Sequence, residues 1–209
     1  MKLICLFIFL GYHLLMFGQS VNDSPLSAYS DEWDKKEYIK CNTSSDINYL
    51  STEEKEIIYI LNLVRLYPVL FSNTVLAKYP SVNHKEYLLN DKYYYRSLRK
   101  TLGDMSPQNL LEFDKLCYES AFCHAVESGK KGYTGHGRPN KTCEDERHYM
   151  GECCDYGNSE PLEIVLSLLI DESVPSLGHR KILLGNYTKI GLSIKPHKKY
   201  ETNTVIDLW

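Results

Sequence analysis

The sequence predicts a layered α+β domain, in which helices pack on the faces of a small antiparallel sheet. Two observations predict this class. Several segments before residue 171 repeat apolar residues at helical spacing, and segment 190–208 alternates apolar and polar residues as paired strands do. The chain of 209 residues is long enough for one such domain with a sizeable core.

Residues 1–20 have the features of a secretory signal peptide: a positive start at Lys2, an apolar middle and a small-residue end near Ser20. The apolar run is short for a bilayer span and is interrupted by Tyr12 and His13, which makes a retained anchor the weaker interpretation. No second segment of spanning length follows. We therefore expect a secreted or periplasmic protein with no stable membrane span after signal removal.

The cysteines agree with export. Cleavage near Ser20 removes Cys5 and leaves an even number of cysteines, which favours disulfide bonds in an oxidising compartment. Cys117 and Cys123 are six residues apart on a predicted helix and face different sides, so we expect each to pair elsewhere. The available partners nearby are Cys143, Cys153 and Cys154. A zinc site made of these thiols is the alternative.

Composition excludes one class of partner and sets one segment apart. The net charge is −3 and the basic residues are scattered among acids, so the chain has no electrostatic footprint for nucleic acid, and we expect no nucleic-acid partner. Residues 21–48 are rich in Ser, Asn and Asp and poor in aliphatic residues, which predicts a flexible N-terminal arm. The domain proper is then expected over residues 49–209.

The starts and ends of several helices in this domain can be predicted from capping and helix-breaking residues. Ser51 and Glu54 form a capping-box pattern that predicts the start of a helix, and Pro68 prevents that helix from running on. Further helices are expected over residues 85–102, before Gly103, and over residues 107–128, before Gly129. His124 falls among the packing positions of the latter helix and is interpreted as a core residue.

Two histidines in similar glycine frames are the most specific feature of the chain. His136 lies in Gly-His-Gly-Arg within an irregular segment, and His179 lies in Gly-His-Arg after a predicted turn. Between them come Glu152, on a predicted strand, and the pair Asp171 and Glu172, at the end of a predicted helix. Imidazoles and carboxylates can share a proton near neutral pH or hold a divalent metal together.

The order of these motifs resembles that of the CAP superfamily, the cysteine-rich secretory, antigen 5 and pathogenesis-related proteins, and most of all its bacterial-type branch. The motifs that carry the resemblance are Asn62-x-x-Arg65, Leu116 to His124, His136, Gly151-Glu152, Leu168 to Asp171, Gly178-His179-Arg180 and Ile190-Gly191. They span residues 49–209. The resemblance implies a three-layer α-β-α sandwich, secretion, and a cleft where two histidines and two acids converge.

By position, the resemblance assigns His136, Glu152 and His179 to this cleft, with Asp171 as the second acid and Glu172 as its alternative. Cys153 stands where the family often has Asn, which favours a structural role for Cys153 or Cys154. Members of the superfamily have been linked to lipid or sterol binding, protease-like activity and host interaction. The expected partner is therefore a lipid, a peptide or a host-surface ligand, and the fold alone does not choose among them.

Three hypotheses use the same residues. In the leading one, His136 and His179 bind Zn²⁺ or another divalent cation, the acids orient the imidazoles, and the chain acts as a binding or interaction module. In the alternative, the protein is a metal-assisted or acid–base hydrolase with Glu152 as the base, although the chain has no His-Glu-x-x-His motif. In the third, the four side chains form only a structural hydrogen-bonded network.

Overall fold

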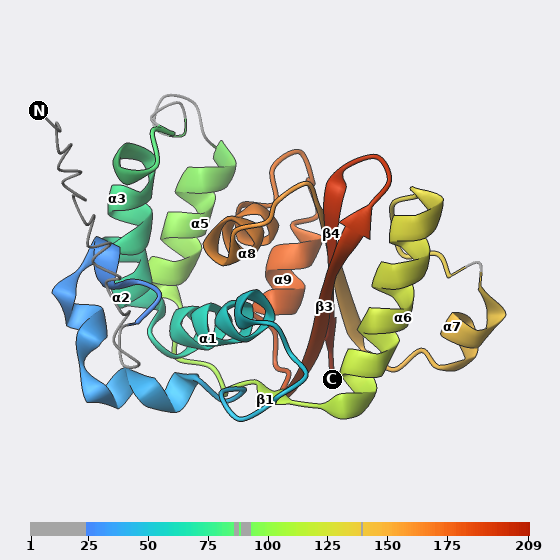
Figure 1. Ribbon diagram of the computed structural model, residues 1–209. Coiled ribbons are helices and arrows are strands. Elements are labelled where there is room, and N and C mark those ends of the chain that lie inside the picture. Colours follow the sequence, from blue (N-terminus) through green and yellow to red (C-terminus); the bar gives the residue numbers. More distant parts are fainter. Residues whose placement is uncertain (1–23, 86–87, 89–92, 139) are drawn as a thin grey trace, which may run out of the picture.

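The computed structural model describes residues 24–85, 88, 93–138 and 140–209. The predicted signal peptide lies outside these residues. A four-stranded sheet is covered on both faces by helices (Figure 1). Helices α1, α8 and α9 contact one face, and α6 contacts the other with α7 beside it. The predicted α+β class and the α-β-α arrangement are confirmed.

The sheet has the order β1-β3-β4-β2 and comprises β1 (Glu112–Phe113), β2 (Gly151–Tyr156), β3 (Lys189–His197) and β4 (Glu201–Leu208). The predicted C-terminal hairpin is β3 and β4, and β2 pairs antiparallel with β4. The short strand β1 pairs parallel with β3, so the sheet is mixed. The register of β2 and β4 sets Glu152 opposite Asp207, a pairing that matters for the site.

The helices described are α1 (Thr52–Leu66), α2 (Pro68–Asn73), α3 (Val75–Val82), α5 (Tyr93–Asp104), α6 (Lys115–Lys131), α7 (Lys141–Asp145), α8 (Pro161–Ile170) and α9 (Gly178–Leu183). The predicted capping box begins α1: the Glu54 amide donates to Ser51 Oγ at 3.1 Å, and the Ser51 amide donates to Glu54 Oε2 at 2.9 Å. Pro68 ends that helix by starting α2. In the described part of the chain, no single helix has both the length and the apolar character needed to cross a membrane. Helix α1 and residues Pro68–Val82 together reach that length and apolar character, but the chain bends by 116° between them.

Two helix predictions had the wrong limits. The helix expected over 107–128 begins at Lys115, because the side chain of Asp114 accepts the amide of Cys117 at 3.0 Å and caps the helix there. It continues past Gly129 and ends at Gly132, whose left-handed φ of 71° closes the last turn. In the helix expected over 85–102, residues 86–87 and 89–92 lie outside the described residues, and α5 passes through Gly103 to Asp104.

The N-terminal segment differs from the predicted flexible arm. Over the described residues 24–48 it forms three short 3₁₀ helices, Ser27–Tyr29, Asp31–Asp34 and Lys36–Cys41. Five of its apolar residues are buried in the main core: Leu26, Tyr29, Trp33, Tyr38 and Cys41. The average composition of the segment did not predict this ordered structure, because a few large side chains bury enough surface to order a segment that is otherwise polar.

Asn62 and Arg65 of α1 join parts of the chain that lie far apart in the sequence. The Asn62 amide donates to the carbonyls of Cys41 and Leu111, and its oxygen accepts the Leu111 amide at 2.7 Å. The guanidinium of Arg65 is buried and donates only to backbone carbonyls, those of Asn109, Leu183, Gly185 and Tyr187. Burial lowers the pKa of Arg65 to about 10. These contacts fix the end of α9 against α1.

One disulfide bond joins α6 to α7. It links Cys123 to Cys143, one of the expected partners. Cys117 lies on another side of α6 and is free, as are Cys41, Cys153 and Cys154, all of them buried. A disulfide of this kind is typical of proteins that fold in oxidising compartments outside the cytosol.

Candidate functional site

His136 and Glu152 form the first of two histidine–carboxylate pairs. His136 lies in the segment after α6, and its Nδ1 is 2.8 Å from Oε1 of Glu152 on β2. The side chain of His136 is 56% exposed, whereas that of Glu152 is 1% exposed. The carboxylate of Glu152 is therefore buried on the sheet, and the imidazole of His136, in the segment after α6, is accessible to solvent.

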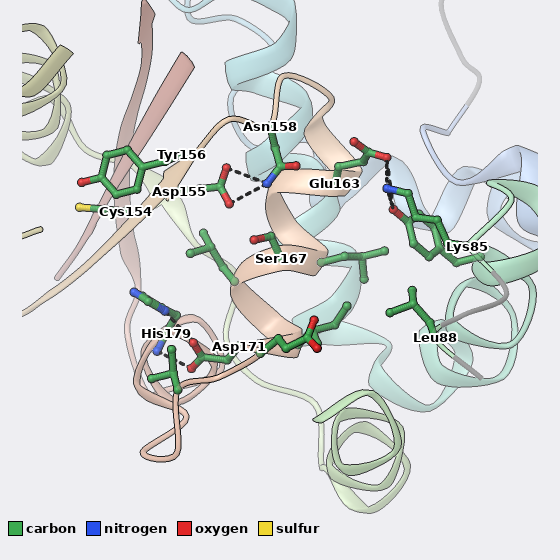
Figure 2. Close-up of a pocket in the computed structure, with 16 residues that line it drawn as sticks. Lys85, Leu88, Cys154, Asp155, Tyr156, Asn158, Glu163, Ser167, Asp171 and His179 are labelled. Atoms are coloured by element: carbon green, nitrogen blue, oxygen red, sulfur yellow. Dashed lines mark hydrogen bonds and ion pairs between the residues drawn. The ribbon is translucent and has the colours of Figure 1, made fainter. Parts of the chain in front are cut away.

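Asp171 and His179 form the second pair (Figure 2). Asp171 ends α8 in the left-handed conformation, with φ of 57°, and its Oδ1 is 2.7 Å from Nδ1 of His179. Its other oxygen accepts the backbone amides of His179, at 3.0 Å, and Arg180, at 3.4 Å. Asp171 thus ends one helix, caps the next and orients the ring. Glu172, the alternative second acid, is exposed and makes neither of these contacts.

The two imidazoles face each other. Their ring centroids are 6.4 Å apart and the ring planes are inclined by 40°. Because a carboxylate accepts a hydrogen bond from each Nδ1, the neutral rings carry hydrogen on Nδ1 and a lone pair on Nε2. The hydrogen bond to Glu152 raises the pKa of His136 above its ordinary value, although burial acts against it. The structure therefore brings His136, Glu152, Asp171 and His179 together as two adjacent pairs.

A buried charge network lies behind Glu152. Nη2 of Arg138 contacts Oε2 of Glu152 and lies 3.2 Å from Oδ2 of Asp207, so one guanidinium serves two carboxyl groups. Arg138 Nη1 also donates to the Ser120 carbonyl at 2.8 Å. Ser120 Oγ donates to Asp207 at 2.6 Å.

The pKa values of the two acids move in opposite directions. Burial raises the pKa of Glu152, but the hydrogen bond from His136 and the charge of Arg138 outweigh it, and the pKa lies below its ordinary value. Burial and the charge of Glu152 hold the pKa of Asp207 well above its ordinary value. Sequence reasoning missed both Asp207 and Arg138 as members of the network. The available signal was an acid inside an apolar strand, since a buried acid requires a partner.

The same contacts limit what Glu152 can do chemically. A general base must reach the proton it takes and must have a pKa near the working pH. Oxygen Oε1 of Glu152 accepts from His136, Oε2 faces Arg138, and the pKa is lowered. These features suit a carboxylate that orients an imidazole and do not suit a base toward water.

A pocket of about 390 Å³ opens beside His179. Of the four site residues, only His179 and Asp171 line it. The expected cleft shared by all four residues is therefore not formed as one pocket, since His136 and Glu152 are not part of the lining. Figure 2 shows α8 running along the pocket with Ser167 and Glu163 on it. Asp155 accepts two hydrogen bonds from Asn158, and an ion pair between Lys85 and Glu163 lies at the far side.

His124 is buried, as predicted for a core residue. Its Nε2 is 3.0 Å from the carbonyl oxygen of Gly135, so it anchors the segment that carries His136. Ligand atoms of His124, Glu152 and Cys154 lie within 4.8 Å of one another, and so do those of Asp114, Cys117 and His148. The described residues thus contain two groups of possible metal ligands besides the pair of His136 with His179, which we call the histidine pair.

Comparison with known proteins identifies no family. The sequence matches no protein-family model and no curated protein. Among solved structures, the chain is similar to an outer surface protein from Borrelia burgdorferi, at 22% sequence identity and a TM-score of 0.39. The match covers 55% of this chain and 86% of that one.

Proposed function

We propose that this chain is an exported, CAP-like binding module in which His136 and His179 bind a divalent cation, Zn²⁺ foremost, at the edge of a ligand pocket. One observation carries the proposal: each histidine presents Nδ1 to its own buried carboxylate. Carboxylates in this position fix the tautomer and raise the basicity of metal-binding histidines. Nε2 of each ring is then the atom available to the metal.

The spacing of the rings fits an exchangeable ion. Two imidazoles on one tetrahedral zinc, with bonds of about 2.0–2.1 Å, place their centroids roughly 5 Å apart. The observed separation is 6.4 Å, and the side chain of His136 is 56% exposed, which leaves its ring room to turn toward His179. Two protein ligands leave positions for water or for an atom of a bound ligand, which is typical of open sites.

The pocket supports a binding role. Its lining mixes four carboxyl groups with aliphatic side chains, among them Leu166, Ile170 and Val174, which favours a peptide with both polar and apolar side chains over a lipid chain as the ligand. The acids of the lining are Asp155, Glu163, Asp171 and Glu172. The disulfide of Cys123 with Cys143 supports an extracellular or periplasmic location, where such a ligand is met.

Zinc titration by calorimetry tests the histidine pair. The double variant His136→Ala/His179→Ala is expected to lose one equivalent of bound zinc, because both neutral imidazole ligands are gone. His84→Ala is the control, since His84 is exposed and lies outside the pair. Zinc stoichiometry and affinity unchanged in the double variant would contradict the proposal. A lower unfolding temperature with zinc binding intact would instead favour the purely structural network.

The choice of second acid has its own test. Asp171→Asn is expected to weaken zinc binding by about 10–100-fold, because the amide no longer holds the His179 tautomer as a carboxylate does. Glu172→Gln removes the neighbouring charge without touching a hydrogen bond to His179 and is expected to leave the affinity within about twofold. Equal losses in the two variants would show that net charge, and not ring orientation, controls the affinity.

A further inference from the structure

A second cluster of metal-binding groups lies where α6 begins. Asp114, Cys117 and His148 place one ligand atom each within 4.8 Å of the others. None of the three belongs to the histidine pair or to the pocket. We propose that Asp114, Cys117 and His148 form a second metal site, which takes a thiophilic divalent cation of the Zn²⁺ class and leaves one coordination position open.

Helix α6 presents two of the three ligands. Asp114 is its N-cap and Cys117 lies in its first turn, three residues on, so both side chains meet at the same helix end. Cys117 is a free cysteine, and a metal that binds its sulfur displaces the thiol proton to solvent. The Asp114 carboxylate keeps lone pairs for a metal beyond the hydrogen bond that it accepts from the Cys117 amide.

The third ligand is held in place by two contacts that do not consume its ring nitrogens. The His148 backbone amide donates to Ser120 Oγ at 3.0 Å. Its ring stacks on Trp209, with centroids 4.3 Å apart and planes inclined by 9°. Stacking uses the ring face, whereas both nitrogens lie on the ring edge. The position of the imidazole is therefore fixed before a metal arrives, as a binding site requires.

The competing charge at this cluster is displaceable. Nζ of Lys189 lies 3.3 Å from the second oxygen of Asp114, and the lysine side chain is half exposed. It can turn into solvent when a metal takes its place. The other group of possible ligands, His124, Glu152 and Cys154, is less suitable. Arg138 already neutralises Glu152, and Nε2 of His124 is bonded to a backbone carbonyl.

Cobalt substitution tests the second site separately from the histidine pair. Co²⁺ bound to a thiolate gives an ultraviolet sulfur-to-metal charge-transfer band, and the pair of His136 with His179 supplies no sulfur. The full chain and the His136→Ala/His179→Ala variant are both expected to show the band. Cys117→Ser is expected to abolish it, and His148→Ala is expected to weaken cobalt affinity by at least about tenfold.

Two matched controls keep this test decisive. Cys154→Ala removes the thiol of the competing group and Cys41→Ala removes another buried free thiol, and both are expected to retain the band. If Cys117→Ser fails to fold by circular dichroism, the partly exposed His148→Ala carries the test alone. Absence of the band in the wild-type chain, its persistence in Cys117→Ser, or unchanged cobalt affinity in His148→Ala would overturn the proposal. Failure of zinc binding at the histidine pair leaves these outcomes unaffected.

Discussion

Replacing Arg138 with methionine is expected to destabilise the fold by about 3–5 kcal/mol at neutral pH, the cost of removing one partner from a buried ion pair. The guanidinium is fully buried and is the cation that contacts both Glu152 and Asp207. Without it, two carboxyl groups face each other across β2 and β4, where water cannot reach them. Urea unfolding followed by circular dichroism measures the loss.

The pH dependence of this loss identifies its cause. In the variant, burial raises the pKa of both carboxyls above the unfolded values, so the folded state holds their protons more tightly. Such groups stabilise the fold below their unfolded pKa of about 4, and this contribution is lost as the pH rises through the folded pKa. In the wild type the pKa of Glu152 is lowered, so this residue makes the fold less stable as the pH falls. The difference in the free energy of unfolding between the wild type and Arg138→Met is therefore expected to become smaller on acidification.

A triple variant that also neutralises both acids is the control for Arg138→Met. The triple variant Arg138→Met/Glu152→Gln/Asp207→Asn removes the cation together with both acidic groups, and it is expected to regain much of the stability at neutral pH. A triple variant no more stable than Arg138→Met would mean that lost packing, and not unpaired charge, causes the defect. A gap that stays constant with pH would lead to the same conclusion.

Gly191→Ala is expected to separate α6 from the sheet, at a cost of at least about 3 kcal/mol, the upper end of the usual range for overpacking. A Cβ atom at this position on β3 would lie 1.9 Å from the Tyr118 amide nitrogen and 2.3 Å from the Cys117 carbonyl carbon. Both are backbone atoms of α6 and cannot turn aside as a side chain can. Denaturant unfolding and the melting temperature measure the effect.

Gly103→Ala is the matched control for Gly191→Ala. Gly103 lies within α5, and an added Cβ would have no atom within 4 Å. Alanine is favoured over glycine by about 0.5–1 kcal/mol inside a helix and by less near its end, so this variant is expected to be at least as stable as the wild type. Similar unfolding midpoints for Gly191→Ala and the wild type would show that α6 does not depend on the close approach.

The sequence predicted those parts of the fold that depend on neighbours along the chain. The capping box of Ser51 with Glu54 and the C-terminal hairpin each have their signal within a few residues, and both are present. The N-cap Asp114 was overlooked because apolar spacing ran on through it into Leu110 and Phe113. Strand β1, with two residues, is too short to show any alternation.

The candidate site was predictable only in part, where its signals lie among neighbouring residues of the chain. The glycine frames marked His136 and His179 locally, and the chain order suggested their acids. The network behind Glu152 was not predictable, because Glu152 and Asp207 meet only through the register of β2 against β4, and Arg138 reaches Asp207 across a separation of 69 residues. No local pattern records which residue a strand will oppose. The role of His124 as an anchor was hidden likewise, since core packing and hydrogen bonding to Gly135 give the same pattern.

The bond between Cys123 and Cys143 closes a covalent ring, and His136 is a member of that ring. One arc of the ring is the rigid end of α6, so the remaining arc, with its imidazole, cannot stray far from the protein surface. A thiol reductant opens the ring without touching any metal ligand. We therefore expect reduction of the disulfide to loosen the segment that carries His136, so that the oxidised chain holds this imidazole near His179 most firmly.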